Sequence, residues 1–130
     1  MSALGAARAD LAEVERIVRR AGTSFYRGMK VLPRDRRAAM YAIYAYCRLV
    51  DDVADEPAPI HEKLAGLAAW RDRVDALYAG HASDAVTRVL LKAVQRYGLR
   101  REDFLAVIDG MQMDTATAIV APDLATLDLY

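Results

Sequence analysis

The chain of 130 residues is 55% apolar and 28% charged, and its 18 basic residues balance its 18 acidic ones. This length has room for one domain with one hydrophobic core, and the zero net charge lacks the basic excess that is usual in nucleic-acid-binding proteins. A single cysteine, Cys47, excludes an internal disulfide, the charged N-terminus lacks the apolar core of a signal peptide, and no apolar run is long enough to span a bilayer. These features predict a cytoplasmic protein.

A first helix is expected near the N-terminus. Apolar side chains recur every three or four positions between charged ones over residues 7–20, which is the pattern of an amphipathic helix. Gly22 is placed to end this helix, and Thr23 or Ser24 can cap a second, short helical segment.

The next helix is expected from Arg34 to Ala54. Pro33 suits its first turn, where the missing N–H costs nothing. After three arginines in its first turns the helix becomes apolar on nearly all faces. Such a helix is typical of the centre of a bundle, so we expect the rest of the chain to be organised around it.

Proline and glycine divide the remainder of the chain. Pro57 and Pro59 interrupt the helical pattern, Gly80 and Gly98 end later helices, and Ala-Pro-Asp at 121–123 interrupts the last one. The expected helices span residues 61–79, 84–97 and 101–118, and a further helical pattern follows from 124 to 130. No run alternates with period two, so no strand is predicted and the fold class is all-α.

The central helix ends in three carboxylates, Asp51, Asp52 and Asp55. Buried charge is costly unless a cation neutralises it, and acids at a helix C-terminus oppose the helix dipole. Asp51 and Asp55, four residues apart, project from one face. That spacing suits Mg²⁺, which binds one or two protein carboxylates together with substrate phosphates and water. A solvated helix end or a surface ion-pair network has the same composition, so spacing alone leaves both interpretations open.

An aromatic and cationic stripe precedes the acids, consisting of Tyr41, Tyr44 and Arg48. The guanidinium fork of Arg48 suits the two phosphates of a diphosphate, and tyrosine rings can face a carbocation. The pattern favours a site that binds an allylic diphosphate through Mg²⁺ and ionises it. Ordinary helical ion pairs between Arg48 and the acids, each worth a few tenths of a kcal/mol, are the alternative.

The stretch TSFYRGMKVLPRDRRAAMYAIYAYCRLVDDVAD, from Thr23 to Asp55, closely resembles the N-terminal part of the squalene and phytoene synthases. It contains that family's Ser-Phe pair, its LP…RR…aiYayCR helix and its first aspartate-rich motif. The resemblance continues through Leu67–Tyr78 and Phe104–Asp114. The segments DDVADEP and LAAW…DALYAG look most like the bacterial hopanoid-pathway branch of the family, the presqualene diphosphate synthases.

The resemblance implies an isoprenoid-synthase-type helical bundle, of which residues 1–130 would form a single, incomplete N-terminal domain. It implies a Mg²⁺-dependent prenyltransferase that condenses two farnesyl diphosphates head to head to presqualene diphosphate. A phytoene synthase that uses geranylgeranyl diphosphate, and a non-catalytic helical remnant that binds a partner, remain the alternatives.

The resemblance also assigns roles to individual residues. It places Mg²⁺ on Asp51, Asp52 and Asp55, substrate on Ser24, Phe25 and Arg48, and catalytic tyrosines at Tyr44 and Tyr130. The family's second aspartate-rich motif does not occur in these 130 residues, so we expect this polypeptide alone to be inactive or very weak. An unfinished bundle should also expose apolar surface and self-associate.

A basic cluster of Arg27, Lys30, Arg34, Arg36 and Arg37 is compatible with attraction of a diphosphate or with peripheral contact at the inner face of the membrane. A solvated basic face is the commoner role of such a cluster. Nucleic acid is not expected as a partner.

Overall fold

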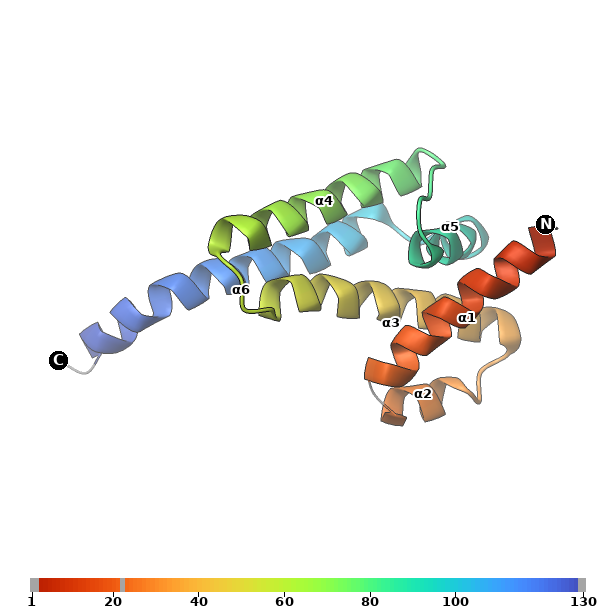
Figure 1. Ribbon diagram of the computed structural model, residues 1–130, viewed down its shortest axis with the longest axis horizontal. Coiled ribbons are helices and arrows are strands. Elements are labelled where there is room, and N and C mark those ends of the chain that lie inside the picture. Colours follow the sequence, from red (N-terminus) through yellow and green to blue (C-terminus); the bar gives the residue numbers. More distant parts are fainter. Residues whose placement is uncertain (1–2, 22, 129–130) are drawn as a thin grey trace.

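The computed structural model is all-α, as the sequence predicts (Figure 1). It describes the backbone of residues 3–21 and 23–128 and the side chains of residues 8–20 and 26–115, and no strand occurs in these parts of the chain. The helices are α1 (Ala3–Ala21), α2 (Thr23–Met29), α3 (Arg34–Asp55), α4 (Ile60–Tyr78), α5 (Ala85–Tyr97) and α6 (Arg101–Asp128).

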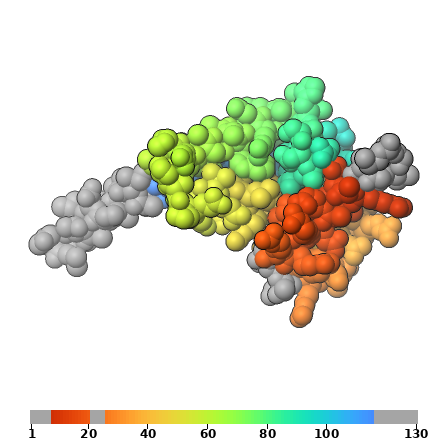
Figure 2. Space-filling model, viewed as in Figure 1, coloured from red at the N-terminus to blue at the C-terminus, as the bar shows by residue number. Residues whose placement is uncertain are grey.

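Helix α3 is the central element, because it contacts all five of the other helices. Figure 1 shows α1, α2 and α5 around its N-terminal half, whereas α4 and α6 lie side by side along its C-terminal half. In the space-filling view the yellow part of α3 is visible between α1 and α4 (Figure 2). The prediction that the chain is organised around this helix is therefore confirmed.

The buried face of α3 combines small residues with two tyrosines. Ala42 and Ala45 are fully buried, and their size lets neighbouring helices approach closely. Tyr46 makes edge-to-face contacts with Trp70 and Phe104, at ring-centroid distances of 5.5 and 5.1 Å. Its hydroxyl donates a 2.7 Å hydrogen bond to the carbonyl of Phe104. This cluster ties α3 to α4 and α6.

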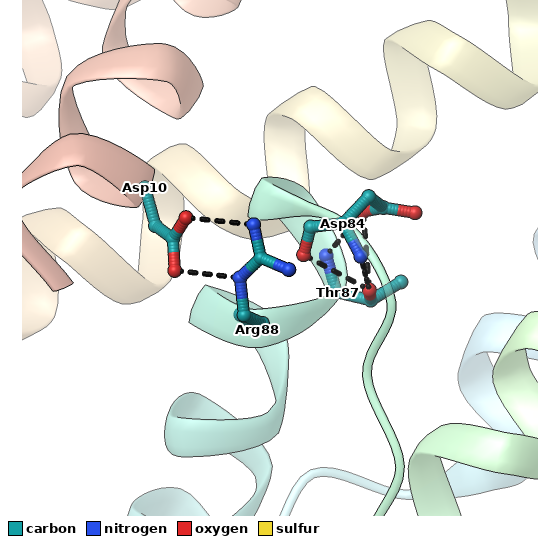
Figure 3. Close-up of polar contacts among 4 residues, drawn as sticks. All are labelled: Asp10, Asp84, Thr87 and Arg88. Carbon is teal, nitrogen blue, oxygen red and sulfur yellow. Dashed lines mark hydrogen bonds and ion pairs between the residues drawn. The ribbon is translucent and has the colours of Figure 1, made fainter. Parts of the chain in front are cut away.

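Local signals place most helix ends where the sequence predicts them. Asp84 caps α5 through a reciprocal capping box with Thr87 (Figure 3). Gly98 follows α5 with φ of 64°, the left-handed conformation that glycine adopts without strain. Pro33 and Pro59 directly precede α3 and α4. These residues fix the lengths of the helices around the central one.

The predicted break at residues 121–123 is wrong, because α6 continues to Asp128. Pro122 cannot donate an N–H to the carbonyl of Ala118, which costs one hydrogen bond but does not end the helix. The residues around Pro122 include Ile119, Val120 and Asp123, which are weak helix formers. Local propensity therefore does not explain why the helix continues. Tyr130 lies outside the described residues.

Within the described residues, no helix combines the length and the apolar character that a membrane crossing requires.

Candidate functional site

The three acids at the end of α3 divide between two faces of the helix. Asp51 and Asp55 line a surface pocket of about 350 Å³ between α3, α4 and α6. Asp52 instead lines a separate groove beside α1, α4 and α5. Its Oδ1 forms an ion pair with Nε of Arg48 at a distance of 3.2 Å. The structure therefore brings Asp51 and Asp55 together and places Asp52 apart from them.

The surroundings of Asp51 favour the protonated form of its carboxyl group. Partial burial raises the pKa of its carboxyl group above the ordinary value of 3.8, and the neighbouring Asp55 carboxylate raises that pKa further. Arg48 acts in the opposite direction without cancelling these effects. Neither carboxylate of the pair has a cation within ion-pair distance among the described residues. The two carboxylates therefore repel each other when both are ionised, and a hydrogen bond with Asp55 favours the protonated form of Asp51.

A divalent cation fits this pair on chemical grounds. Mg²⁺ prefers carboxylate oxygens and keeps the rest of its coordination sphere for water and substrate phosphates. Asp51 and Asp55 can supply two such oxygens from one side. In the part of the chain that the structure describes, no group of three or more metal-ligating side chains occurs. The remaining ligands would therefore come from outside these residues.

Other walls of the pocket come from α4 and α6. Lys63 adds a cation from α4, Asp114 adds a third carboxylate from α6, and Met111 adds an apolar surface. Buried Thr115 satisfies its hydroxyl by donating to the carbonyl of Met111 at 2.9 Å. Sequence reasoning missed Lys63. The turn at residues 56–59, which folds the start of α4 back onto the end of α3, is the signal that could have found it.

The two tyrosines of the predicted stripe occupy different environments. Tyr41 is buried and stacks on Tyr26 of α2, with ring centroids 5.8 Å apart and an interplanar angle of 16°. Burial raises the pKa of its hydroxyl. Tyr44 is half-buried and packs against the core. Tyr41 lies ten residues before Asp51, or about 15 Å along the helix axis, so it belongs to the packing of α2 and not to the acid pocket.

The remaining predicted residues lie where their side chains are not described. Ser24 and Phe25 belong to the short helix α2, which packs against α1 and α3, and Tyr130 follows the described chain. The roles of these three residues stay predictions. In the same helix, Tyr26 donates to Glu15 and accepts from Arg19, both at 2.7 Å, which holds α2 against α1.

Comparison with known proteins finds similarity to the squalene and phytoene synthases over most of the chain. A family model described as squalene/phytoene synthase matches residues 18–130. The presqualene diphosphate synthase of Sinorhizobium fredii is 50% identical over 109 residues, which are 84% of this chain and 39% of that protein. The presqualene diphosphate synthase of Zymomonas mobilis is 53% identical over 109 residues, which are 83% of this chain and 37% of that protein. The 15-cis-phytoene synthase of Synechococcus elongatus is 34% identical over 102 residues, which are 78% of this chain and 33% of that protein.

A solved structure has the same fold. The crystal structure of squalene synthase HpnC from Alicyclobacillus acidocaldarius matches with a TM-score of 0.74 and 29% identity, over 83% of this chain and 40% of that one. The chain thus spans about two fifths of the length of the relatives and of the structure that it matches.

Proposed function

Because the chain belongs to the squalene/phytoene synthase family, we propose that it forms part of a Mg²⁺-dependent prenyltransferase that condenses two farnesyl diphosphates to presqualene diphosphate. The observation that carries this proposal is the Asp51–Asp55 pair, which lines a pocket and has no cation within ion-pair distance among the described residues. About 50% identity to presqualene diphosphate synthases, against 34% to a phytoene synthase, favours the farnesyl over the geranylgeranyl substrate.

The charged residues in and beside the pocket have complementary tasks in this reaction. Bound to Asp51 and Asp55, Mg²⁺ would neutralise the diphosphate and make it a better leaving group. Arg48, half exposed beside Asp52, can donate two parallel hydrogen bonds to phosphate oxygens. Lys63 faces the same pocket from α4 and adds a further positive charge. Arg48 and Lys63, together with the metal when it is bound, would stabilise the negative charge that develops as the carbon–oxygen bond breaks.

The apolar side of the site would hold the allylic chain. Met111 lines the pocket beside Asp51, and Tyr44 precedes Asp51 by seven residues, about 10 Å along the same helix. An aromatic ring at that place can stabilise an allylic cation. The double bond of the second farnesyl diphosphate then attacks the cation, a proton is lost, and the cyclopropane ring closes.

The expected partners and location are part of the same proposal. Farnesyl diphosphate is the substrate, and the protein works in the cytoplasm with peripheral contact at the membrane that holds its long-chain products. Exposed Lys30 and Val31, which is 84% exposed, lie on the turn between α2 and α3 and suit such contact. Exposed Met40 and Met113 are candidates for self-association.

The test is an assay of diphosphate release and product. Because the chain spans about two fifths of its relatives, the assay needs a protein of their full length that carries these residues. With farnesyl diphosphate and Mg²⁺ we expect presqualene diphosphate, and an Asp51→Asn variant should lose at least tenfold in rate. Activity with geranylgeranyl diphosphate alone would establish the phytoene alternative. Diphosphate release from neither substrate would leave the non-catalytic helical remnant as the better account.

A further inference from the structure

A second pocket lies at the opposite end of α3 from the acids. It has a volume of about 920 Å³ and is formed by α1, the start of α3 and the end of α5, the three helices that gather at one end of the molecule in Figure 1. We call it the basic cleft. Its apolar lining consists mainly of Leu11, Ala38, Ala39, Val89 and Ala93. None of the residues assigned to the proposed reaction lines it.

The charge in this cleft is strongly one-sided. Its five cations are Arg8, Arg34, Arg37, Lys92 and Arg96, and its two acids are Glu15 and Asp35. Both acids already have partners, because Asp35 pairs with Arg96 at 2.8 Å and Glu15 binds Arg19 and Tyr26. Among the described residues, no carboxylate lies within ion-pair distance of Arg8, Arg34, Arg37 or Lys92. A chain of zero net charge therefore concentrates unneutralised positive charge in one hollow.

The start of α3 adds backbone donors to the same cleft. The N-cap residue is Pro33, which has no side-chain acceptor, and the first hydrogen bond into the helix runs from the N–H of Arg37 to the carbonyl of Pro33 at 2.8 Å. The N–H groups of residues 34–36 precede that bond and have no partner inside the helix. The N-terminus of this 22-residue helix therefore presents free N–H donors and the positive end of its dipole to an anion.

Helix stability does not explain these cations. Arg96 in the last turn of α5 interacts favourably with the dipole of that helix. Arg34 and Arg37 in the first turns of α3 oppose the dipole of theirs, and they outnumber the one acid there, Asp35. The acids at the other end of α3 oppose it as well. The unfavourable charges at the two ends of α3 are consistent with a ligand at each end, a cation at the acids and an anion at the arginines.

We propose that the basic cleft binds a phosphate-bearing anion, at a site separate from the acid pocket. Arginine forks from α1 and α3 and the ammonium group of Lys92 provide the donors that phosphate oxygens prefer. The apolar lining can hold a hydrocarbon chain attached to the phosphate. A free prenyl or inorganic diphosphate and the headgroup of an anionic phospholipid share this chemistry.

The test measures binding without Mg²⁺, so that the acid pocket does not contribute. Inorganic diphosphate is titrated by calorimetry, and vesicles of phosphatidylglycerol are compared with vesicles of phosphatidylcholine in a sedimentation assay. The variants are Arg8→Glu and Arg34→Glu, and the matched control is Arg20→Glu, an exposed arginine of α1 outside the cleft. Arg34→Glu improves the charge at the start of α3, so its thermal melting should show an intact fold.

We expect each cleft variant to weaken binding at least fivefold while Arg20→Glu changes it less than twofold. Binding of inorganic diphosphate would identify a soluble diphosphate as the source of the phosphate, and binding of phosphatidylglycerol vesicles alone would identify a lipid headgroup. Binding of neither probe, or equal losses in the cleft and control variants, would overturn the proposal. Because catalysis is not measured, this result is independent of the proposed function.

Discussion

Val53 packs directly over Gly66, where α4 passes the acid-bearing end of α3. A Cβ atom added to Gly66 would lie 2.7 Å from Cγ1 of Val53, which is too close for two carbon atoms. The β-branched side chain of Val53 has few rotamers into which it can move. Because Val53 lies between Asp51 and Asp55 in the sequence, the absence of a side chain at Gly66 sets how closely α4 approaches the acid pocket.

We therefore expect Gly66→Ala to destabilise the protein, although alanine is the better helix former. Overpacking typically costs about 1–3 kcal/mol, which exceeds the gain of about 1 kcal/mol from helix propensity. Chemical denaturation monitored by circular dichroism measures the difference. The matched control is Gly110→Ala in α6, where a Cβ would meet no atom within 4 Å, and this variant should be neutral or more stable. A stabilising Gly66→Ala would show that the contact is not tight.

The acids of α3 should give opposite results when each is neutralised. Asp51→Asn removes a like-charge neighbour of Asp55, which should raise stability by about 0.2–0.5 kcal/mol. Asp52→Asn breaks the half-exposed pair with Arg48 and should lower stability by a similar, small amount. Thermal melting at neutral pH without Mg²⁺ compares them. Added Mg²⁺ should raise the melting temperature of the wild type and not that of Asp51→Asn. A destabilising Asp51→Asn would mean that the two carboxylates do not repel.

The raised pKa of Asp51 gives this comparison a pH dependence. A carboxyl whose folded-state pKa lies above its unfolded value binds its proton more tightly in the native state. Its contribution to stability is therefore complete below pH 3.8 and is lost as pH rises through the folded-state pKa. The stability gained by Asp51→Asn should accordingly grow from acidic to neutral pH, and Mg²⁺ should reduce the gain that is seen at neutral pH.

The helices were predictable because their signals are local. Asp84 and Gly98 act through their own side chain and conformation, and the apolar character of α3 alone indicates its central place. The acid site was only partly predictable. At about 100° per residue, Tyr44, Asp51 and Asp55 lie within about 40° of one another around the helix, Arg48 lies about 20° beyond Asp55, and Asp52 lies about 40° beyond Arg48. The predicted stripe of Tyr41, Tyr44, Arg48, Asp51 and Asp55 did not account for this drift, and Tyr41 packs against α2 instead.

Contacts between segments that are distant in the sequence could not be predicted from the pattern of residues. Lys63 reaches the acid pocket only because the turn at residues 56–59 reverses the chain. The basic cleft joins Arg8, Arg34 and Lys92 from three helices, and their spacing in the sequence has no common period. At Pro122 the local sequence predicts a break, yet α6 continues through this residue to Asp128.

Asp10 of α1 and Arg88 of α5 form the most complete ion pair between helices, with hydrogen bonds of 2.7 and 2.9 Å (Figure 3). The Asp10 side chain is only 14% exposed, so Asp10→Asn should lower the melting temperature by a few degrees. The exposed neighbour pair of Glu13 and Arg16 supplies the control, because Glu13→Gln should have little effect. Equal melting temperatures for the two variants would contradict a linking role for Asp10.

The ion pair of Asp10 and Arg88 should also make the stability of the protein fall in acid. The hydrogen bond from Arg88 lowers the pKa of Asp10 below its ordinary value of 3.8. A carboxyl with a lowered folded-state pKa stabilises the native state above its unfolded pKa, and this contribution is lost as pH falls through the lowered value. Asp10→Asn should therefore differ from the wild type at neutral pH and converge with it in acid. The trend is opposite in sign to that of Asp51, so melting curves across pH can separate the two.

The Tyr46 hydroxyl links α3 to α6 inside the core, and Tyr46→Phe removes it while keeping the ring contacts with Trp70 and Phe104. The carbonyl of Phe104 keeps its place in the hydrogen bonding of α6, so the loss should be about 1 kcal/mol and not the full cost of an orphaned buried group. Tyr78→Phe is the matched control, since its hydroxyl donates to the carbonyl of Leu99 from a half-buried position, and it should cost less. Denaturant titration of both variants measures this difference. If Tyr78→Phe proved the more costly, the junction of α5 and α6, and not the α3 core, would be the stronger hydrogen-bonded link to α6.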